Sequence, residues 1–263
     1  MFSMRFASPQ AGLRPFRTAL LALVAFSLLA AAPATAEMTL DEILSNYYEA
    51  LGGKDAWAKV ENVRQTGSMS MMGMEAPFTV VLAEPNKTKV EFEIQGMKGI
   101  QSFDGDSGWQ LMPFMGSTEP EEMPDEMVKM MSASAGVAGP LFEYEAKGNK
   151  VELVGTADVE GTAAYQLHIT LPNGFEMDWF LDAEYFVPIQ SKMTMEVQGQ
   201  TFETTTTLSD YKEIGGVMMA HSTTQSTPMG AQTMTVTKTE VNVDLGDDFF
   251  AMPAKAESEE GGE

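Results

Sequence analysis

The protein has 263 residues, of which 38 are acidic and 16 are basic, and it contains 22 methionines but no cysteine. A formal net charge of −22 argues against nucleic acid as a partner, because phosphate binding requires clustered lysine and arginine, and against electrostatic docking on anionic lipid. The composition also excludes disulfides, thiolate zinc sites and cysteine nucleophiles. Only His168 and His221 remain for acid–base chemistry by histidine, so the composition disfavours an enzyme.

The first 36 residues have the three parts of a secretory signal peptide. An apolar run covers 18–32, and Ala34-Thr35-Ala36 supplies the small–x–small pattern of a cleavage site. The run is shorter than the roughly 20 residues that a membrane-spanning helix requires, so cleavage between Ala36 and Glu37 is favoured over an uncleaved anchor. Three arginines precede the run: Arg5, Arg14 and Arg17. We therefore expect a periplasmic protein of a Gram-negative bacterium, without stable membrane insertion after cleavage.

The first element after the cleavage site is predicted to be a helix. Its apolar residues follow helical spacing: Leu40, Ile43, Tyr47 and Leu51. Thr39 and Glu42 form the pattern of a capping box at its start, and Gly52-Gly53 is typical of a left-handed helix end. A short second helix is expected to carry Trp57 and Val60.

The hydrophobic period then changes to two, which is typical of strands with one buried face. Charged and apolar residues alternate without interruption over 89–94. Pro172-Asn173-Gly174 separates two other alternating runs with the residues of a hairpin turn. Threonine-rich strands are expected around 201–211, 217–227 and 231–243. We count about ten or eleven strands joined by short turns, which favours antiparallel pairing.

One stretch, 116–146, interrupts the strands with prolines, carboxylates and a helical run near 124–134. Four methionines fall on one face of this run: Met123, Met127, Met130 and Met131. The acidic tail, 254–263, is predicted to be disordered. We predict a single domain over 37–253 that is mainly β with some helix (α+β). Its fold is an incomplete, strongly curved antiparallel β-barrel with an N-terminal helix and a helical lid.

The two histidines have simpler explanations than catalysis. His168 alternates with Leu167 and Ile169 and is therefore expected on the solvated face of its strand. His221 stands beside Ser222, but the G-x-S-x-G motif of a serine hydrolase is absent. We predict no catalytic residue.

The run from Asp104 to Gly108 is similar to a calcium-binding loop. Gly108 occupies its fifth position, where a side-chain oxygen is required, so a hairpin turn is the better interpretation. Neither a zincin motif nor a P-loop occurs. We therefore predict neither a metal site nor a cofactor.

Methionine is unbranched and polarizable, and methionine-rich surfaces suit apolar ligands of variable shape. A single methionine is most simply core filling, whereas the stripe over 123–131 has to cover an apolar surface. We expect the apolar face of the curved sheet, closed by this helix, to form a hydrophobic cavity. Each methylene of an acyl chain buried there contributes about 0.8 kcal/mol to the binding free energy. The residues predicted to line it are Phe78, Val80, Leu82, Val90, Phe92, Ile94, Trp109, Leu167, Ile169, Met177, Trp179, Met193 and Met195.

Several short motifs occur in a fixed order along the chain. They are Glu84-Pro85-Asn86, Phe103-Asp104-Gly105 followed by Trp109, Leu181-Asp182-Ala183-Glu184 with Pro188, and Asp248-Phe249-Phe250 before Pro253. In this order, after an N-terminal helix, they are similar to the motifs of the LolA-like family of outer membrane lipoprotein-sorting proteins. The resemblance covers most of the mature chain. It implies an incomplete β-barrel whose hydrophobic cavity is covered by helices and holds acyl chains.

In LolA an arginine precedes the Pro-Asn pair and helps to keep the lid closed, whereas this sequence has Glu84 there. Arg64 is the one arginine after the cleavage site. Arg64 and Glu84 are therefore the candidates for locking the lid. The resemblance also implies an inner-membrane extractor and an outer-membrane receptor as partner proteins.

The leading hypothesis is a non-enzymatic periplasmic carrier that shields acyl chains of lipoproteins or other lipids in transit to the outer membrane. An alternative is a module that senses lipid or lipoprotein and reports to a partner in envelope-stress signalling. An esterase that uses His221 ranks third.

Overall fold

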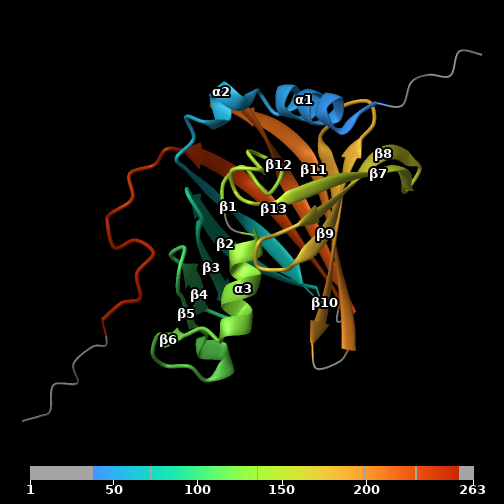
Figure 1. Ribbon diagram of the computed structural model, residues 1–263. Helices are drawn as coiled ribbons and strands as arrows, with labels where there is room; N and C mark the ends of the chain where they lie inside the picture. Colours follow the sequence, from blue (N-terminus) through green and yellow to red (C-terminus); the bar gives the residue numbers. More distant parts are fainter. Residues whose placement is uncertain (1–37, 72, 135, 198–199, 229, 255–263) are drawn as a thin grey trace, which may run out of the picture. The chain divides into compact units, whose positions relative to one another are not determined.

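The computed structural model describes residues 38–254 except 72, 135, 198–199 and 229, and one β-sheet dominates this part of the chain (Figure 1). The sheet has 13 antiparallel strands in the order β6-β5-β4-β3-β2-β1-β13-β12-β11-β10-β9-β8-β7. The strands are β1 (Asn62–Met71), β2 (Met74–Ala83), β3 (Lys87–Ile94), β4 (Met97–Phe103), β5 (Gly108–Leu111), β6 (Glu121–Glu122), β7 (Lys150–Val159), β8 (Thr162–Thr170), β9 (Glu176–Asp182), β10 (Pro188–Val197), β11 (Gln200–Ile214), β12 (Val217–Thr227) and β13 (Gly230–Val241). Within the described residues the edge strands β6 and β7 do not pair with each other, so the sheet is not closed.

The predicted mainly β, antiparallel and incomplete barrel is therefore confirmed, but the sheet has 13 strands rather than ten or eleven. The additional strands lack an uninterrupted alternating pattern. In β1 the register shifts at Gly67, and in β7 it shifts just before Gly155. Strand β6 has only two residues, Glu121–Glu122, and both are exposed. Such segments become strands through their neighbours rather than through their own periodicity.

Helix α1 (Leu40–Ala50) follows the predicted start and end signals. The Thr39 side chain accepts a hydrogen bond from the Glu42 amide (3.3 Å), and the Glu42 carboxylate accepts one from the Thr39 amide (2.8 Å). The Thr39 hydroxyl also donates to the Glu42 carboxylate (2.9 Å), and the bonds from the Thr39 amide and hydroxyl lower the pKa of Glu42. Gly52 has a φ of 103°, and an added Cβ would lie 2.3 Å from the Gly216 carbonyl oxygen, so only glycine fits where α1 ends. The predicted second helix is α2 (Lys54–Trp57), which carries Trp57 but ends before Val60.

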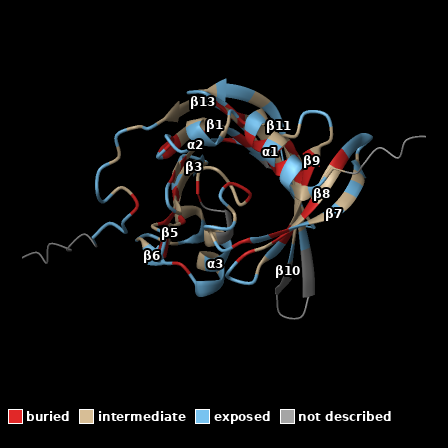
Figure 2. Ribbon diagram, turned by 45° about the horizontal axis from the view of Figure 1, so that its top comes forward, coloured by how far each residue is buried: buried red, intermediate tan, exposed pale blue. Residues whose placement is uncertain are grey.

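Strand register defines two faces of the sheet. We call the face that carries Phe78 and Val80 the inner face, and the face that carries Thr79 and Val81 the outer face. The main core lies on the inner face, where α1 packs against β8, β9 and β12. Figure 2 shows buried segments, in red, on the strands next to α1, whereas α3 (Asp125–Ser134) is tan and pale blue.

The C-terminal segment, which we define as residues 245–250, covers part of the outer face. Phe250 is buried with Val81 and Ala83, and Leu245 and Phe249 pack against them. The Phe250 carbonyl accepts two hydrogen bonds of 2.8 Å, one from the buried Ser102 hydroxyl and one from the Trp109 indole. The sheet is therefore buried on both faces at β2 and β4.

The predicted signal peptide with its cleavage site at Ala36 and Glu37, and the tail from residue 255, lie outside the described residues. The predicted domain boundaries stay predictions. No helix among the described residues combines the length and the apolar character needed to cross a membrane.

Candidate ligand-binding face

The register of the sheet places the predicted cavity residues on the inner face, with one exception. Phe78 pairs with Phe92, and Val80 pairs with Val90. On the same face of the distant strands β8, β9 and β10, Leu167 pairs with Trp179, Ile169 with Met177, and Met177 with Met193. Leu82 and Ile94 follow at the next inner-face positions of their strands, and the side chain of Met195 lies outside the described residues. Residues far apart in the sequence thus share one apolar face.

Trp109 is the exception, because it lies on the outer face. It pairs with Ser102, which pairs with Lys89, which pairs in turn with Val81. Its indole N–H donates a hydrogen bond to the Phe250 carbonyl. Trp109 therefore anchors the C-terminal segment and does not face the same space as Phe78.

One end of the inner face is filled by the protein's own side chains. Leu167 and Ile169 are fully buried and Met177 is nearly so, in the cluster that includes Ile43 and Tyr47 of α1. These three predicted cavity residues belong to the folding core in this structure. Trp179 and Met193 are only partly buried and pack at the edge of the same cluster.

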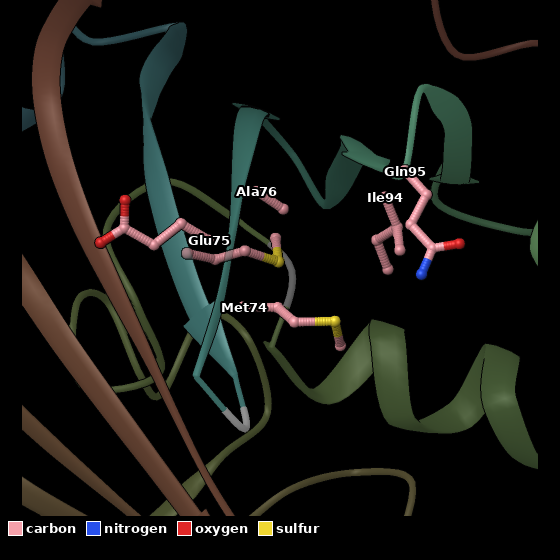
Figure 3. Close-up of a pocket in the computed structure, with 6 residues that line it drawn as sticks. Met74, Glu75, Ala76, Ile94 and Gln95 are labelled. Carbon is pink, nitrogen blue, oxygen red and sulfur yellow. The ribbon is translucent and has the colours of Figure 1, made fainter.

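The other end of the inner face carries a pocket of about 260 Å³, which Figure 3 shows in close-up. It lies about 20 Å along β1 from Val63, which belongs to the core under α1. Its lining residues are Met69, Met74, Glu75, Ala76, Ile94 and Gln95. Phe78, Val80 and Phe92 pack with Met69 and Ile94 in a cluster separate from the main core. The inner face is thus packed at one end and hollowed at the other.

The sequence pattern identified Ile94 as a pocket residue but missed Met69 and Met74. Both methionines lie beside the β1–β2 turn, where the alternation of Ser-Met-Ser-Met over 68–71 lasts for only four residues. This short alternation and the high density of methionine in 69–74 are the signals that could have indicated them. Met74 is 48% exposed, so it stands at the opening of the pocket.

The predicted lid helix corresponds to α3, which lies over the inner face of β4 and β5. Met123 is buried just before the helix, with its sulfur 2.9 Å from the position of a Cβ added to Gly108. The Gln101 amide donates a hydrogen bond of 3.7 Å to the sulfur of Met127. Met131 is partly buried and Met130 is 46% exposed. The first two methionines of the stripe, Met123 and Met127, therefore pack on the sheet, whereas the last two are only partly covered.

A connecting segment, which we define as residues 137–141, follows α3 and is held from four places. The Glu84 carboxylate accepts a hydrogen bond from the Val137 amide (3.1 Å). Lys147, Asn149 and Tyr48 donate to the carbonyls of residues 139, 140 and 141, at 2.9, 2.8 and 2.8 Å. Burial lowers the pKa of Lys147, and Glu84 and Glu143 oppose that change. The chain leaving α3 is therefore fixed while the helix itself is lightly packed.

The two candidates for locking the lid lie in different places. Glu84, which directly follows β2, contacts the connecting segment through Val137. Arg64 is on the outer face, paired with Val81 and with Glu240, where it lines a pocket of about 220 Å³. The structure thus brings Glu84, but not Arg64, to the chain that carries α3.

His221 is buried on the inner face with both ring nitrogens in hydrogen-bonding contact. Nδ1 lies 3.0 Å from the Met219 carbonyl oxygen and Nε2 lies 3.2 Å from the Thr239 hydroxyl. Ser222 follows His221 within β12 and therefore points to the opposite face. The arrangement does not form the serine–histidine pair that an esterase needs.

His168 and Asp104 also have structural partners. The Nδ1 atom of His168 lies 2.9 Å from a carboxylate oxygen of Asp178 on the outer face. The Asp104 carboxylate accepts hydrogen bonds from the amides of Asp106 and Ser107 in the β4–β5 turn, as the predicted hairpin requires. In the described part of the chain, no cluster of three or more histidine or acidic residues could hold a metal ion.

No protein-family model matches the sequence, and no curated protein matches it. Solved structures do match. A LolA superfamily protein from Nitrosomonas europaea superposes with a TM-score of 0.53 at 14% identity, over 81% of this chain and 97% of that one. The chain has a LolA-like fold. A domain named for outer membrane lipoprotein sorting, from Vibrio parahaemolyticus, matches with a TM-score of 0.52 at 13% identity, over 80% and 95% of the two chains. A DUF1329 family protein from Desulfovibrio piger matches with a TM-score of 0.53 at 12% identity, over 79% and 96%.

Proposed function

We propose that this LolA-like protein is a periplasmic carrier that shields acyl chains, those of lipoproteins in the first place, against the inner face of its sheet. The observation that carries the proposal is the division of the inner face into a packed end under α1 and an apolar, hollowed end beside Met69 and Ile94. The LolA-like fold supports it, since two matching structures carry the names LolA and lipoprotein sorting.

The size of the pocket indicates how a chain would bind. Ligand pockets commonly have volumes of about 300–1,000 Å³, so a pocket of about 260 Å³ takes one end of an acyl chain. The rest of the chain would lie along the partly buried residues Val80, Leu82 and Val90. Each methylene removed from water contributes about 0.8 kcal/mol, so even half of a long chain supplies several kcal/mol.

Helix α3 is the lid in this proposal. It offers Met127 and Met131 to an apolar ligand, and thioether side chains adapt to chains of variable shape. The hydrogen bond between Glu84 and the Val137 amide holds the chain after α3, so Glu84 takes the locking role and Arg64 does not. An inner-membrane extractor and an outer-membrane receptor would load and unload the carrier. No covalent step is required, and the proposed protein is not an enzyme.

Binding of a fluorescent palmitoylated peptide to the purified mature protein tests the function. We expect saturable binding, and at least a tenfold weaker affinity for Ile94→Glu, because its charge would enter the pocket. Thr79→Glu is the matched control: it adds the same charge on the outer face and should bind like the native protein. Absence of saturable binding, or equal affinity of Ile94→Glu and the native protein, contradicts the proposal.

A further inference from the structure

The pocket of about 220 Å³ beside Arg64, which we call the outer-face pocket, is formed by strands β1, β2 and β3 together with the C-terminal segment. Arg64, Val81 and Lys89 stand in one cross-strand row. Val81 is buried, and Phe249 packs in the same cluster, so these two side chains give the pocket an apolar wall. The full lining is Arg64, Thr79, Val81, Lys89, Glu91 and Phe249.

Arg64 is partly buried at this pocket, yet its guanidinium forms no ion pair and no hydrogen bond with any residue that the structure describes. The two carboxylates around it have lysine partners of their own. Glu91 lies 2.8 Å from the Lys98 ammonium, and Glu240 lies 2.9 Å from the Lys238 ammonium. The hydrogen bond from Lys238 lowers the pKa of Glu240, and the charge of Arg64 adds a smaller effect. The five N–H donors of Arg64 therefore remain available to a ligand.

The charges that line the pocket suit a small anion with a single negative charge. Arg64 and Lys89 supply two positive charges and Glu91 one negative charge, so the lining is positive in a chain whose net charge is −22. Lys89 donates a hydrogen bond to the Phe249 carbonyl (3.0 Å) and holds the C-terminal segment. Glu91 would repel a dianion such as phosphate more strongly than a monoanion. The pocket is smaller than the usual 300–1,000 Å³ or so of ligand sites, so its ligand group is small.

We propose that the outer-face pocket binds a carboxylate, whose oxygens accept hydrogen bonds from the guanidinium of Arg64. The planar fork of a guanidinium matches the two oxygens of a carboxylate. The Thr79 hydroxyl lines the same pocket as a further donor, and the apolar wall accommodates the carbon atoms next to the carboxylate. A free organic acid or an acidic side chain of another protein supplies this group. The site goes beyond the proposed carrier function, because it lies on the opposite face of the sheet from Ile94.

Nuclear magnetic resonance of the purified mature protein tests the site, because Arg64 is the one arginine in residues 37–263 and gives a single arginine Nε–H signal. The protein is titrated at pH 7 and constant ionic strength with sodium benzoate and with N-acetylglutamic acid α-amide, whose only carboxylate is its side chain. We expect a saturable shift of the Arg64 Nε–H signal and of the Val81 amide signal. The tighter of the two compounds identifies the source as a free acid or as an acidic side chain. Inorganic phosphate should bind at least tenfold more weakly than that compound.

Two variants remove the site in different ways. Arg64→Gln should weaken carboxylate binding at least tenfold, as read from the Val81 amide, while it keeps the thermal midpoint. Lys150→Gln is the matched control, since it removes the same charge from the same face of the edge strand β7 and should bind like the native protein. Thr79→Glu places a carboxylate diagonally across from Arg64, within reach of long side chains. It should also weaken carboxylate binding at least tenfold.

Three results overturn the proposed site: no saturable shift with either carboxylate, binding of phosphate as tight as that of the carboxylates, or native affinity in Arg64→Gln or Thr79→Glu. None of them affects the carrier function, which the palmitoylated peptide measures on the inner face. Thr79→Glu separates the two activities in one protein, because it should lose the carboxylate site and keep its affinity for the palmitoylated peptide.

Discussion

Trp109 shows how far a single side chain can depart from the sequence pattern. Its strand, Gly108–Leu111, is too short for alternation to reveal which face is covered. The cover on the outer face comes from Phe250, which is 141 positions away in the sequence. A buried aromatic residue was therefore predictable at 109, but its partner was not.

We expect Trp109→Phe to lower the free energy of unfolding by about 1 kcal/mol. The variant removes the indole donor to the Phe250 carbonyl, and the second donor, Ser102, limits the loss. Urea unfolding measures the difference. Binding of palmitoylated peptide should stay unchanged, because residue 109 is on the outer face. An unchanged stability would contradict the role given to this hydrogen bond.

The capping box at Thr39 and Glu42 predicts a pH-dependent contribution to stability. The hydrogen bonds from Thr39 lower the pKa of Glu42 below its ordinary value of 4.5. A lowered pKa in the folded state stabilises the fold above the unfolded pKa, and this stabilisation disappears as the pH falls through the folded value. We therefore expect Thr39→Ala to destabilise the protein more at pH 7 than at pH 3, as measured by urea unfolding at both values. An equal effect at both pH values would contradict this account.

At the scale of elements, α1 and α3 illustrate two levels of predictability. The start, stripe and end of α1 are local signals, and each is confirmed at Thr39, Tyr47 and Gly52. The existence of α3 was equally visible in its methionine spacing. Its attachment was not, because the residues that hold the connecting segment come from α1, from Glu84 just after β2, and from the chain before β7.

We expect Glu84→Gln to loosen the chain that follows α3. A neutral amide accepts a weaker hydrogen bond from the Val137 amide than a carboxylate does, and the exposure of Glu84 limits the difference to about 1 kcal/mol. Hydrogen exchange at Val137 should then be about fivefold faster. Glu143→Gln, which removes a nearby carboxylate from the same region, is the control and should leave the exchange rate at Val137 unchanged. Equal exchange in Glu84→Gln and the native protein would contradict the proposed lock.

At the scale of the whole sheet, the short turns predicted the antiparallel architecture, and alternation predicted the shared face of residues such as Phe78 and Leu167. A period-two pattern indicates which side chains of a strand lie on the same face, and the folded sheet keeps this arrangement. Alternation could not report that α1 would fill one end of that face, because Leu167 under α1 and Ile94 at the pocket have the same local pattern.

The central claim is that an acyl chain lies on the hollowed end of the inner face, beside Met69, Ile94 and α3. Photo-crosslinking with a diazirine-labelled fatty acid, read out by peptide mass spectrometry, tests it most directly. The account predicts labelling in 69–78, 90–95 and 127–131. Labelling confined to the outer face around Arg64 and Lys89, or to α1, would contradict it.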